Sequence, residues 1–539
     1  MVHLKKYLSF FFILWLGLVL WQCARRGNPT GGPEDVTPPE LIRTVPENFS
    51  TEFKSKTIRL YFDEYIKLED VQNQLIISPP LKNAPEIKPQ GGVSKYVEVI
   101  IKDTLSENTT YTFNFGQSIV DNNEGNPNSF LTYVFSTGTY IDSLTLSGAV
   151  KDAYDRKAEE FISVMLYELD TAFTDSTVFK KPPNYISNTL DSLPIFELKN
   201  LKAGKYKLIA LKDINKNNLF DQRQDKIGFI EDTITVPSDS IYLLNLFKEI
   251  PDYTPSVPSY VAKNRIIFGY QGVQEEISIE SLTDLPDSVR TTILKERETD
   301  TLNYWLTPTD LDSIIFMVSN KVLDQKDTFT VKTRKLGLDS LKLTNSTSSK
   351  LGFEEIFSLL ANTPIRAVDT SNIEAFLNDS LPYNYSYALD SIKNQINFEF
   401  EKEANQSYTF NLYPGAVTDF FGIENDSLSF KFSTGSYADY GNLRVNISGT
   451  VKYPMIVQLT DEQGETQRET ISEVPGPIEF NNLEPARYMI RVIFDDNANG
   501  IWDTGNYLKK IQPEKVSYYP DVIEVRANWE LEQSFIITD

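Results

Sequence analysis

The sequence is poor in the side chains that most often carry out chemistry in proteins. Its 539 residues include one cysteine and one histidine, Cys23 and His3, and both lie near the start of the chain. Residues beyond Cys23 therefore form no disulfide, no Ser-His-Asp or Cys-His catalytic arrangement and no zinc site with His or Cys ligands. Their stability has to come from packed cores, and any catalysis would have to use carboxylates.

Positive charge is also scarce. The chain has 52 Lys and Arg residues against 75 Asp and Glu residues, which gives a formal net charge of −23 at pH 7. A chain of this charge has no general attraction to nucleic acid or to anionic membrane surfaces. We expect no nucleic-acid partner.

The apolar run at residues 7–21 is shorter than the roughly 20 residues that span a bilayer. Lys5 and Lys6 precede it, and Gln22 and Cys23 follow it. This pattern predicts a leader peptide over residues 1–22, and the sequence L-W-Q-C resembles a lipoprotein signal, with Cys23 as the lipidation site. An uncleaved signal anchor is the alternative.

The residues after Cys23 predict how and where the protein is attached. Residues 23–37 are rich in Gly, Pro and polar residues and predict a flexible tether. The position after Cys23 holds Ala24 rather than the aspartate that keeps lipoproteins at the inner membrane. We therefore expect a lipid anchor in the outer membrane, with the cell surface favoured over the periplasmic side.

Several motifs occur twice at a constant spacing. Residues 108–115 recur at 405–412, and residues 135–138 recur at 432–435, both at an offset of 297. Motifs further along, such as Asn200-Leu201 and Asn482-Leu483, recur at an offset of 282. Constant offsets in one order indicate that a pair of modules is duplicated. The first copy then carries about fifteen extra residues, which we place within 171–188.

The first module type covers residues 38–138. It contains alternating apolar and polar stretches typical of half-buried strands, at residues 57–62, 97–101, 111–115 and 133–135. Its motifs VPEN, YFDEYI, ENTTYTFNF, DNNEGN and FSTG resemble those of the bacterial Ig-like domain of S-layer and surface proteins. The second copy, residues 341–436, keeps the later motifs but departs from the pattern at 358–365. We call these two ranges the first and second Ig-like modules.

The second module type follows each of these, at residues 139–250 and 437–539. Both copies open with an alternating stretch, at 144–150 and 443–451. The pattern resembles the small prealbumin-like sandwiches of collagen-adhesin B repeats and carboxypeptidase regulatory domains, which serve chiefly as spacers and binding modules. We call these ranges the first and second prealbumin-like modules.

The stretch between the two pairs, residues 251–340, is the central module. Strand-like segments at 277–281 and 328–332 predict another β-sandwich, of Ig-like type. The whole chain is therefore expected to be all-β, built as tandem sandwiches. Its arrangement resembles a family of Bacteroidota lipoproteins with Ig-like domains.

A nine-residue pattern, D-x-N-x-N-x-x-x-D, opens a loop in each prealbumin-like module. Its oxygen-bearing residues are Asp213, Asn215, Asn217 and Asp221 in the first copy and Asp495, Asn497, Asn499 and Asp503 in the second. They match positions 1, 3, 5 and 9 of an EF-hand-like loop and predict a structural Ca²⁺ site. The twelfth position holds Gln224 or Asn506 instead of the usual Glu. The alternative is an Asx-rich turn without metal.

These observations favour a protein without catalytic activity. A carboxylate-based hydrolase remains a minor alternative, since paired acids such as Asp63 and Glu64 occur. The favoured function is an accessory or scaffold subunit of an outer-membrane complex for export, assembly or uptake, anchored by its lipid and in contact with other outer-membrane proteins. The alternative is an adhesin-like module that binds a glycan or a protein.

Overall fold

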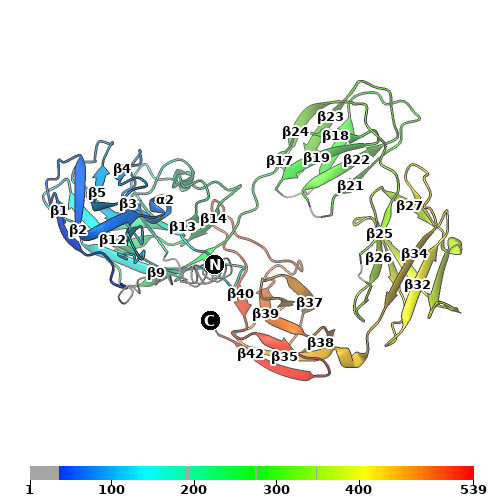
Figure 1. The fold of residues 1–539 in the computed structure, drawn as a ribbon. Coiled ribbons are helices and arrows are strands. Elements are labelled where there is room, and N and C mark those ends of the chain that lie inside the picture. Colours follow the sequence, from blue (N-terminus) through cyan, green and yellow to red (C-terminus); the bar gives the residue numbers. More distant parts are fainter. Residues whose placement is uncertain are drawn as a thin grey trace, which may run out of the picture. The chain divides into compact units, whose positions relative to one another are not determined.

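The structure is a computed structural model, and it describes residues 35–538 apart from Phe130, 190–192, 273–275, Glu298 and 347–348. The predictions for the leader, Cys23 and most of the tether lie outside these residues. Within them the elements are strands except for one short α-helix, α2 (Val71–Gln74), and three 3₁₀ turns (Figure 1). None of the described helices is long and apolar enough to cross a membrane. The predicted all-β class is confirmed.

The chain divides into two compact units, Met1–Ser143 and Leu144–Asp539. Most of the buried hydrophobic residues in the described part of the chain fall into five clusters, and each cluster takes its residues from one of the five modules. Alternation of apolar and polar residues produces this division, because each strand turns one face toward its own cluster.

The first Ig-like module is a two-sheet sandwich. One sheet has the order β1-β2-β5-β4, with β7 paired to β2, and the other has the order β3-β6-β8. On β2, Ile58 and Leu60 are buried and Arg59 between them is exposed, as the alternation predicts. The strands are β1 (Leu41–Val45), β2 (Thr57–Leu68), β3 (Ile76–Ser78), β4 (Glu86–Lys88), β5 (Ser94–Ile100), β6 (Thr110–Asn114), β7 (Ile119–Asp121) and β8 (Thr132–Ser136).

The second Ig-like module repeats this plan with one interruption. The position of the long strand β2 is taken by two strands, β26 and β27, and Pro364 lies between them. Proline lacks the N–H that a ladder needs, so it breaks the strand where residues 358–365 depart from the first copy. The elements are β25 (Leu343–Asn345), β26 (Phe357–Ala361), β27 (Ile365–Val368), η2 (Thr370–Asn372), β28 (Ile373–Leu377), β29 (Leu381–Pro382), β30 (Ser386–Asp390), β31 (Gln395–Glu399), β32 (Ser407–Leu412), β33 (Val417–Asp419) and β34 (Leu428–Ser433).

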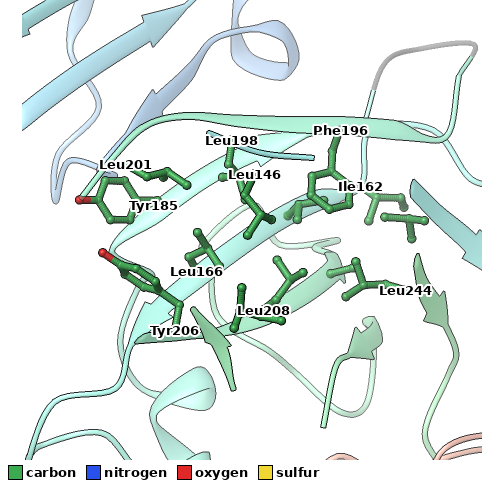
Figure 2. Packing of buried hydrophobic residues seen from close by; sticks show 14 of the residues in the cluster. Leu146, Ile162, Leu166, Tyr185, Phe196, Leu198, Leu201, Tyr206, Leu208 and Leu244 are labelled. Carbon is green, nitrogen blue, oxygen red and sulfur yellow. The ribbon is translucent and has the colours of Figure 1, made fainter. Parts of the chain in front are cut away.

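The first prealbumin-like module pairs a sheet of order β11-β10-β13-β14, with β15 on β13, with a sheet of order β12-β9-β16. Figure 2 shows its core, where Leu146, Leu198 and Leu208 lie between the strands. The elements are β9 (Leu144–Asp152), β10 (Ser163–Glu168), η1 (Asp175–Phe179), β11 (Tyr185–Asn188), β12 (Ile195–Leu201), β13 (Gly204–Lys212), β14 (Lys226–Phe229), β15 (Ile234–Val236) and β16 (Ile241–Leu246).

The second prealbumin-like module has the same strand order, β37-β36-β39-β40 with β41 on β39, and β38-β35-β42. In both copies the last strand pairs in parallel with the first. The duplication read from the sequence is therefore present in the fold. The elements are η3 (Tyr437–Asp439), β35 (Gly441–Gly449), β36 (Met455–Thr460), β37 (Thr466–Ser472), β38 (Ile478–Leu483), β39 (Ala486–Phe494), β40 (Val516–Tyr518), β41 (Ile523–Val525) and β42 (Glu530–Ile537).

The strand register locates the extra residues of the first prealbumin-like module more precisely than the sequence motifs do. Val164 on β10 and Val457 on β36 face equivalent partners at an offset of 293, between the offset of 297 before them and 282 after them. Four extra residues therefore lie between β9 and β10, and the other eleven lie between β10 and β12. The predicted range, 171–188, falls in the segment that holds the larger group, and the smaller group was not predicted.

The central module is also a two-sheet sandwich, with orders β17-β19-β22-β21, where β18 pairs β19, and β20-β23-β24. Both predicted segments are strands, since 277–281 is β20 and 328–332 belongs to β24. The strands are β17 (Thr254–Pro255), β18 (Ser259–Ala262), β19 (Arg265–Gln271), β20 (Ile277–Ser281), β21 (Thr291–Lys295), β22 (Thr301–Leu306), β23 (Ser313–Asn320) and β24 (Gln325–Lys332).

Candidate functional site: the repeated Asp/Asn loops

The two Asp/Asn loops occupy equivalent places in their modules. Each follows the middle strand of the larger sheet, so that Asp213 comes directly after β13 and Asp495 directly after β39. The largely buried strand ends at this point, and the polar residues that follow it form the loop that leads to β14 or β40. The structure therefore places the predicted ligands of each copy on one loop, where Asn215 of the first copy is exposed.

In the first loop the side-chain oxygens accept hydrogen bonds from the loop's own backbone. Asp213 Oδ2 accepts from Asn218 N at 2.6 Å, and Asn217 Oδ1 accepts from Leu219 N at 2.8 Å. Burial raises the pKa of Asp213, and the nearby charge of Asp225 acts in the same direction. These contacts have the geometry of an Asx turn.

The second loop contains more hydrogen bonds between its own residues. Asp495 Oδ1 accepts from Asn499 N at 3.0 Å, and its Oδ2 accepts from Gly500 N at 2.8 Å. The side-chain amides of Asn497 and Asn499 both donate to Asp503 Oδ2, at 2.6 and 2.8 Å. Gly500 has a φ of +78°, a conformation that glycine adopts without strain.

A third acid, which the sequence interpretation missed, closes each loop. Asp225 accepts from Ile214 N at 2.9 Å and from Asp221 N at 2.8 Å. Glu514 accepts in the same way from Asp496 N at 2.7 Å and from Asp503 N at 2.9 Å. Each is followed by a lysine and by a strand, a shared Asp/Glu-Lys signal that could have identified it.

The described residues contain no group of three or more His, Cys, Asp or Glu side chains that could hold a metal ion. A cation in either loop would therefore rely on amide and backbone oxygens together with one or two carboxylates. Those are ligands that Ca²⁺ accepts. The calcium site remains a prediction, and the hydrogen bonds above describe the metal-free alternative.

A cleft of about 920 Å³ lies between the two prealbumin-like modules. Its lining includes Asp155, Arg156, Glu159, Lys212, Glu465 and Tyr518. Charges of both signs line the cleft, and some are already paired, as with Lys212 and Glu159 at 3.5 Å. This lining matches no single class of ligand.

The carboxylates considered for hydrolysis lie in the first Ig-like module. Asp63 is exposed and its Oδ1 accepts from Glu40 N at 2.8 Å, which is a structural role. Burial raises the pKa of Glu64, and the charges of Asp121, Asp63, Asp35 and Glu124 add to the effect. Burial and the neighbouring acids together explain the raised pKa without a substrate.

Comparison with known proteins identifies one module. Residues 35–137 match the bacterial Ig-like domain family. This confirms the resemblance proposed for residues 38–138, and the Bacteroidota lipoprotein family stays a prediction. None of the curated proteins compared with this chain matches it.

Solved structures similar to this chain include two bacterial proteins. The S-layer protein rSbsC(31-844) is 10% identical over 90% of this chain and 67% of its own, with a TM-score of 0.15. BcpA, the major pilin subunit of Bacillus cereus, is 11% identical over 73% of this chain and 99% of its own, with a TM-score of 0.14. TM-scores this low give no support for a shared assembly or activity.

Proposed function

We propose that this chain is a non-catalytic lipoprotein, anchored in the outer membrane through Cys23, that acts as a scaffold or accessory subunit of an envelope complex for export, assembly or uptake. The observation that carries the proposal is the way neighbouring modules of the larger unit are fixed to each other by specific contacts. A scaffold needs its modules at fixed angles, whereas a plain spacer does not.

The contact between the central module and the second Ig-like module supports this. Arg297 donates to three backbone carbonyls of the neighbouring module, those of Lys393, Ala361 and Asn394, at 2.7, 3.1 and 2.9 Å. The rings of Trp305 and Phe421 meet nearby, with centroids 6.1 Å apart. A guanidinium fixed by three acceptors sets a direction as well as a distance.

The next contact, between the second Ig-like and second prealbumin-like modules, is aromatic. Phe353 stacks on Tyr437 at a centroid distance of 4.4 Å and meets Tyr440 edge-on at 5.3 Å. Glu354 accepts a hydrogen bond from Asn482 at 3.1 Å. Stacked rings with a polar neighbour restrict rotation between modules.

Co-purification from the native membrane tests the proposal. A tagged chain should retain specific integral outer-membrane proteins after mild detergent extraction. The variant Arg297→Ala should lose part of that set, while Arg366→Ala, which changes an exposed arginine of the second Ig-like module, should not. If no outer-membrane protein co-purifies with the unchanged chain under conditions that keep known complexes intact, the scaffold proposal is wrong.

The alternative, an adhesin-like module, has one observation in its favour. On an exposed face of the first Ig-like module Arg43 lies over the ring of Tyr61 at 4.1 Å, and Tyr61 pairs with Tyr96 at 5.5 Å. Exposed aromatic rings flanked by cations can contact sugars or protein side chains. A soluble ectodomain that binds a glycan or protein, and loses that binding in Tyr61→Ala and Tyr96→Ala, would favour this function over the scaffold.

Calcium, if bound, would have a structural role in either function. The cation would replace the backbone N–H groups that donate to Asp495 and the side-chain amides that donate to Asp503, and it would stiffen the loop. We infer a structural role because the loop directly follows a central strand, so a stiffer loop would also restrict the motion of that strand.

A further inference from the structure

The two copies of the prealbumin-like module differ by insertions on both sides. Between β10 and β12 the first copy has eleven extra residues, and this segment contains η1. The second copy has its own insertion, because Phe229 on β14 and Tyr518 on β40 correspond at an offset of 289, seven more than the 282 that precedes the loop. The seven extra residues fall between Asp503 and Glu514. We call residues 504–512 the docking loop.

The docking loop packs into an aromatic pocket of the first copy. Tyr507 is only 1% exposed, and its ring lies 5.3 Å from that of Phe229 and 6.4 Å from that of Phe179 in η1. The backbone approaches closely as well, because a Cβ added at Gly505 would lie 2.6 Å from Cζ of Phe247. A buried tyrosine surrounded by aromatic rings is typical of an energetic anchor in an interface.

Polar groups fix the loop's orientation. Glu249, 2% exposed, accepts from Tyr507 N through Oε1 at 2.5 Å and from Gln222 through Oε2 at 2.8 Å. Thr504 donates its hydroxyl to the carbonyl of Lys248 at 2.6 Å. Lys510 of the docking loop pairs with Asp175 of η1 at 3.6 Å, so the two insertions touch each other directly.

A second patch joins the same two modules next to the cleft. Tyr154 of the first copy covers the guanidinium of Arg491 at 4.1 Å, and Tyr518 donates to the Tyr154 carbonyl at 2.7 Å. Arg491 is 1% exposed, and the corresponding position of the first copy holds the buried Ile209. At this position the second prealbumin-like module therefore differs from the first, and the position lies in the contact between the two modules.

We propose that the two insertions are matching halves of a docking contact, so that the second prealbumin-like module is the dedicated partner of the first. The central and second Ig-like modules, residues 251–436, are then held at both ends. This deepens the scaffold proposal above, because it names the contact that would give the larger unit a fixed geometry. The contact can nevertheless be tested without knowing any external partner.

Zero-length cross-linking of the purified, full-length protein tests the proposal. A carbodiimide joins a carboxylate to an amine only where the two already touch, so it should link Asp175 to Lys510, and mass spectrometry identifies the joined peptides. The ion pair of Lys431 and Asp379, 2.5 Å apart within the second Ig-like module, provides an internal control in the same sample. Both links should form in the unchanged chain.

Two variants perturb the contact in different ways, one by removing a side chain and the other by adding one. Tyr507→Ala removes the anchor, and Gly505→Val places a branched side chain against Phe247. Each should reduce the Asp175–Lys510 link about tenfold relative to the control link, a ratio that corresponds to about 1.4 kcal/mol. Survival of the control link shows that the second Ig-like module remains folded.

Three results would overturn the proposal. The first is absence of the Asp175–Lys510 link in the unchanged chain while the control link forms. The second is an undiminished link in both variants. The third is a link that joins two chains, seen as mixed-isotope peptides when labelled and unlabelled protein are combined before reaction. Failure of co-purification alone would refute the scaffold function and leave this contact untouched.

Discussion

Removing the acid that closes the second loop should loosen that loop measurably. Glu514 is 8% exposed and receives two backbone hydrogen bonds, from Asp496 N and Asp503 N. A hydrogen bond to a charged group contributes about 1.5–3 kcal/mol. Glu514→Ala removes both, and because water can reach part of the site we take the lower end, about 3 kcal/mol in total.

Amide hydrogen exchange measures this locally, which matters because a chain of several modules does not unfold in one step. A loss of about 3 kcal/mol predicts exchange about 100-fold faster for the amides of Asp496 and Asp503. Glu514→Gln keeps an acceptor oxygen without the charge, so it serves as the uncharged comparison. Asp225→Ala in the first copy should speed exchange at Ile214 and Asp221 in the same way.

The same acid gives the loop a pH dependence of known sign. Burial raises the pKa of Glu514, and the charges of Asp503 and Asp495 act in the same direction. A carboxyl whose pKa is higher in the folded state binds its proton more tightly there, so the stability gained by protonation is lost as pH rises through the folded pKa. Protection, corrected for intrinsic exchange, should therefore increase as pH falls from 7, and Glu514→Gln should abolish the trend. Unchanged exchange in Glu514→Ala would refute the reasoning.

Three further outcomes are expected. Cys23→Ser should move the protein from the membrane to the soluble fraction, and a variant that stays in the membrane with its leader intact would favour the signal anchor. Calcium should raise the melting temperature and give a binding heat that Asp495→Ala with Asp503→Ala removes, whereas no heat with the unchanged chain would leave the Asx turn as the whole explanation. Glu64→Gln should raise the melting temperature of the first Ig-like module at neutral pH, because burial and nearby acids raise the pKa of Glu64, and the gain should shrink at high salt and disappear below that pKa.

Local patterns carried most of the fold prediction. The segments predicted at 57–62 and 277–281 fall on β2 and β20, because alternation of apolar and polar residues is a property of the strand itself. The interruption at Pro364 was visible in the sequence as a departure from the first copy. Its cause, a proline between two strands, became clear only from the strand pairing in the structure. Motif spacing located the duplication, but it gave only the sum of two separate insertions in the first copy, which the sequence analysis treated as one.

The candidate sites divide in the same way. The Asp and Asn residues of each loop lie within nine consecutive residues and were found by spacing alone. Glu514 lies eleven residues beyond Asp503, whereas Asp225 lies four residues beyond Asp221, so the seven inserted residues hid the correspondence between these two acids and both were missed. A spacing rule works only while the intervening chain has a fixed length.

The sequence by itself determined the all-β class and the tandem, duplicated order of the sandwiches, since each sandwich is specified by its own alternation and turns. Only the tertiary structure decided that the last module docks on the first of its kind. Thr504 and Lys248 are 256 residues apart, and their contact depends on the shapes of two finished surfaces. No local pattern encodes such a fit, because the pocket around Tyr507 exists only after both sandwiches have folded and η1 has placed Phe179 at its edge.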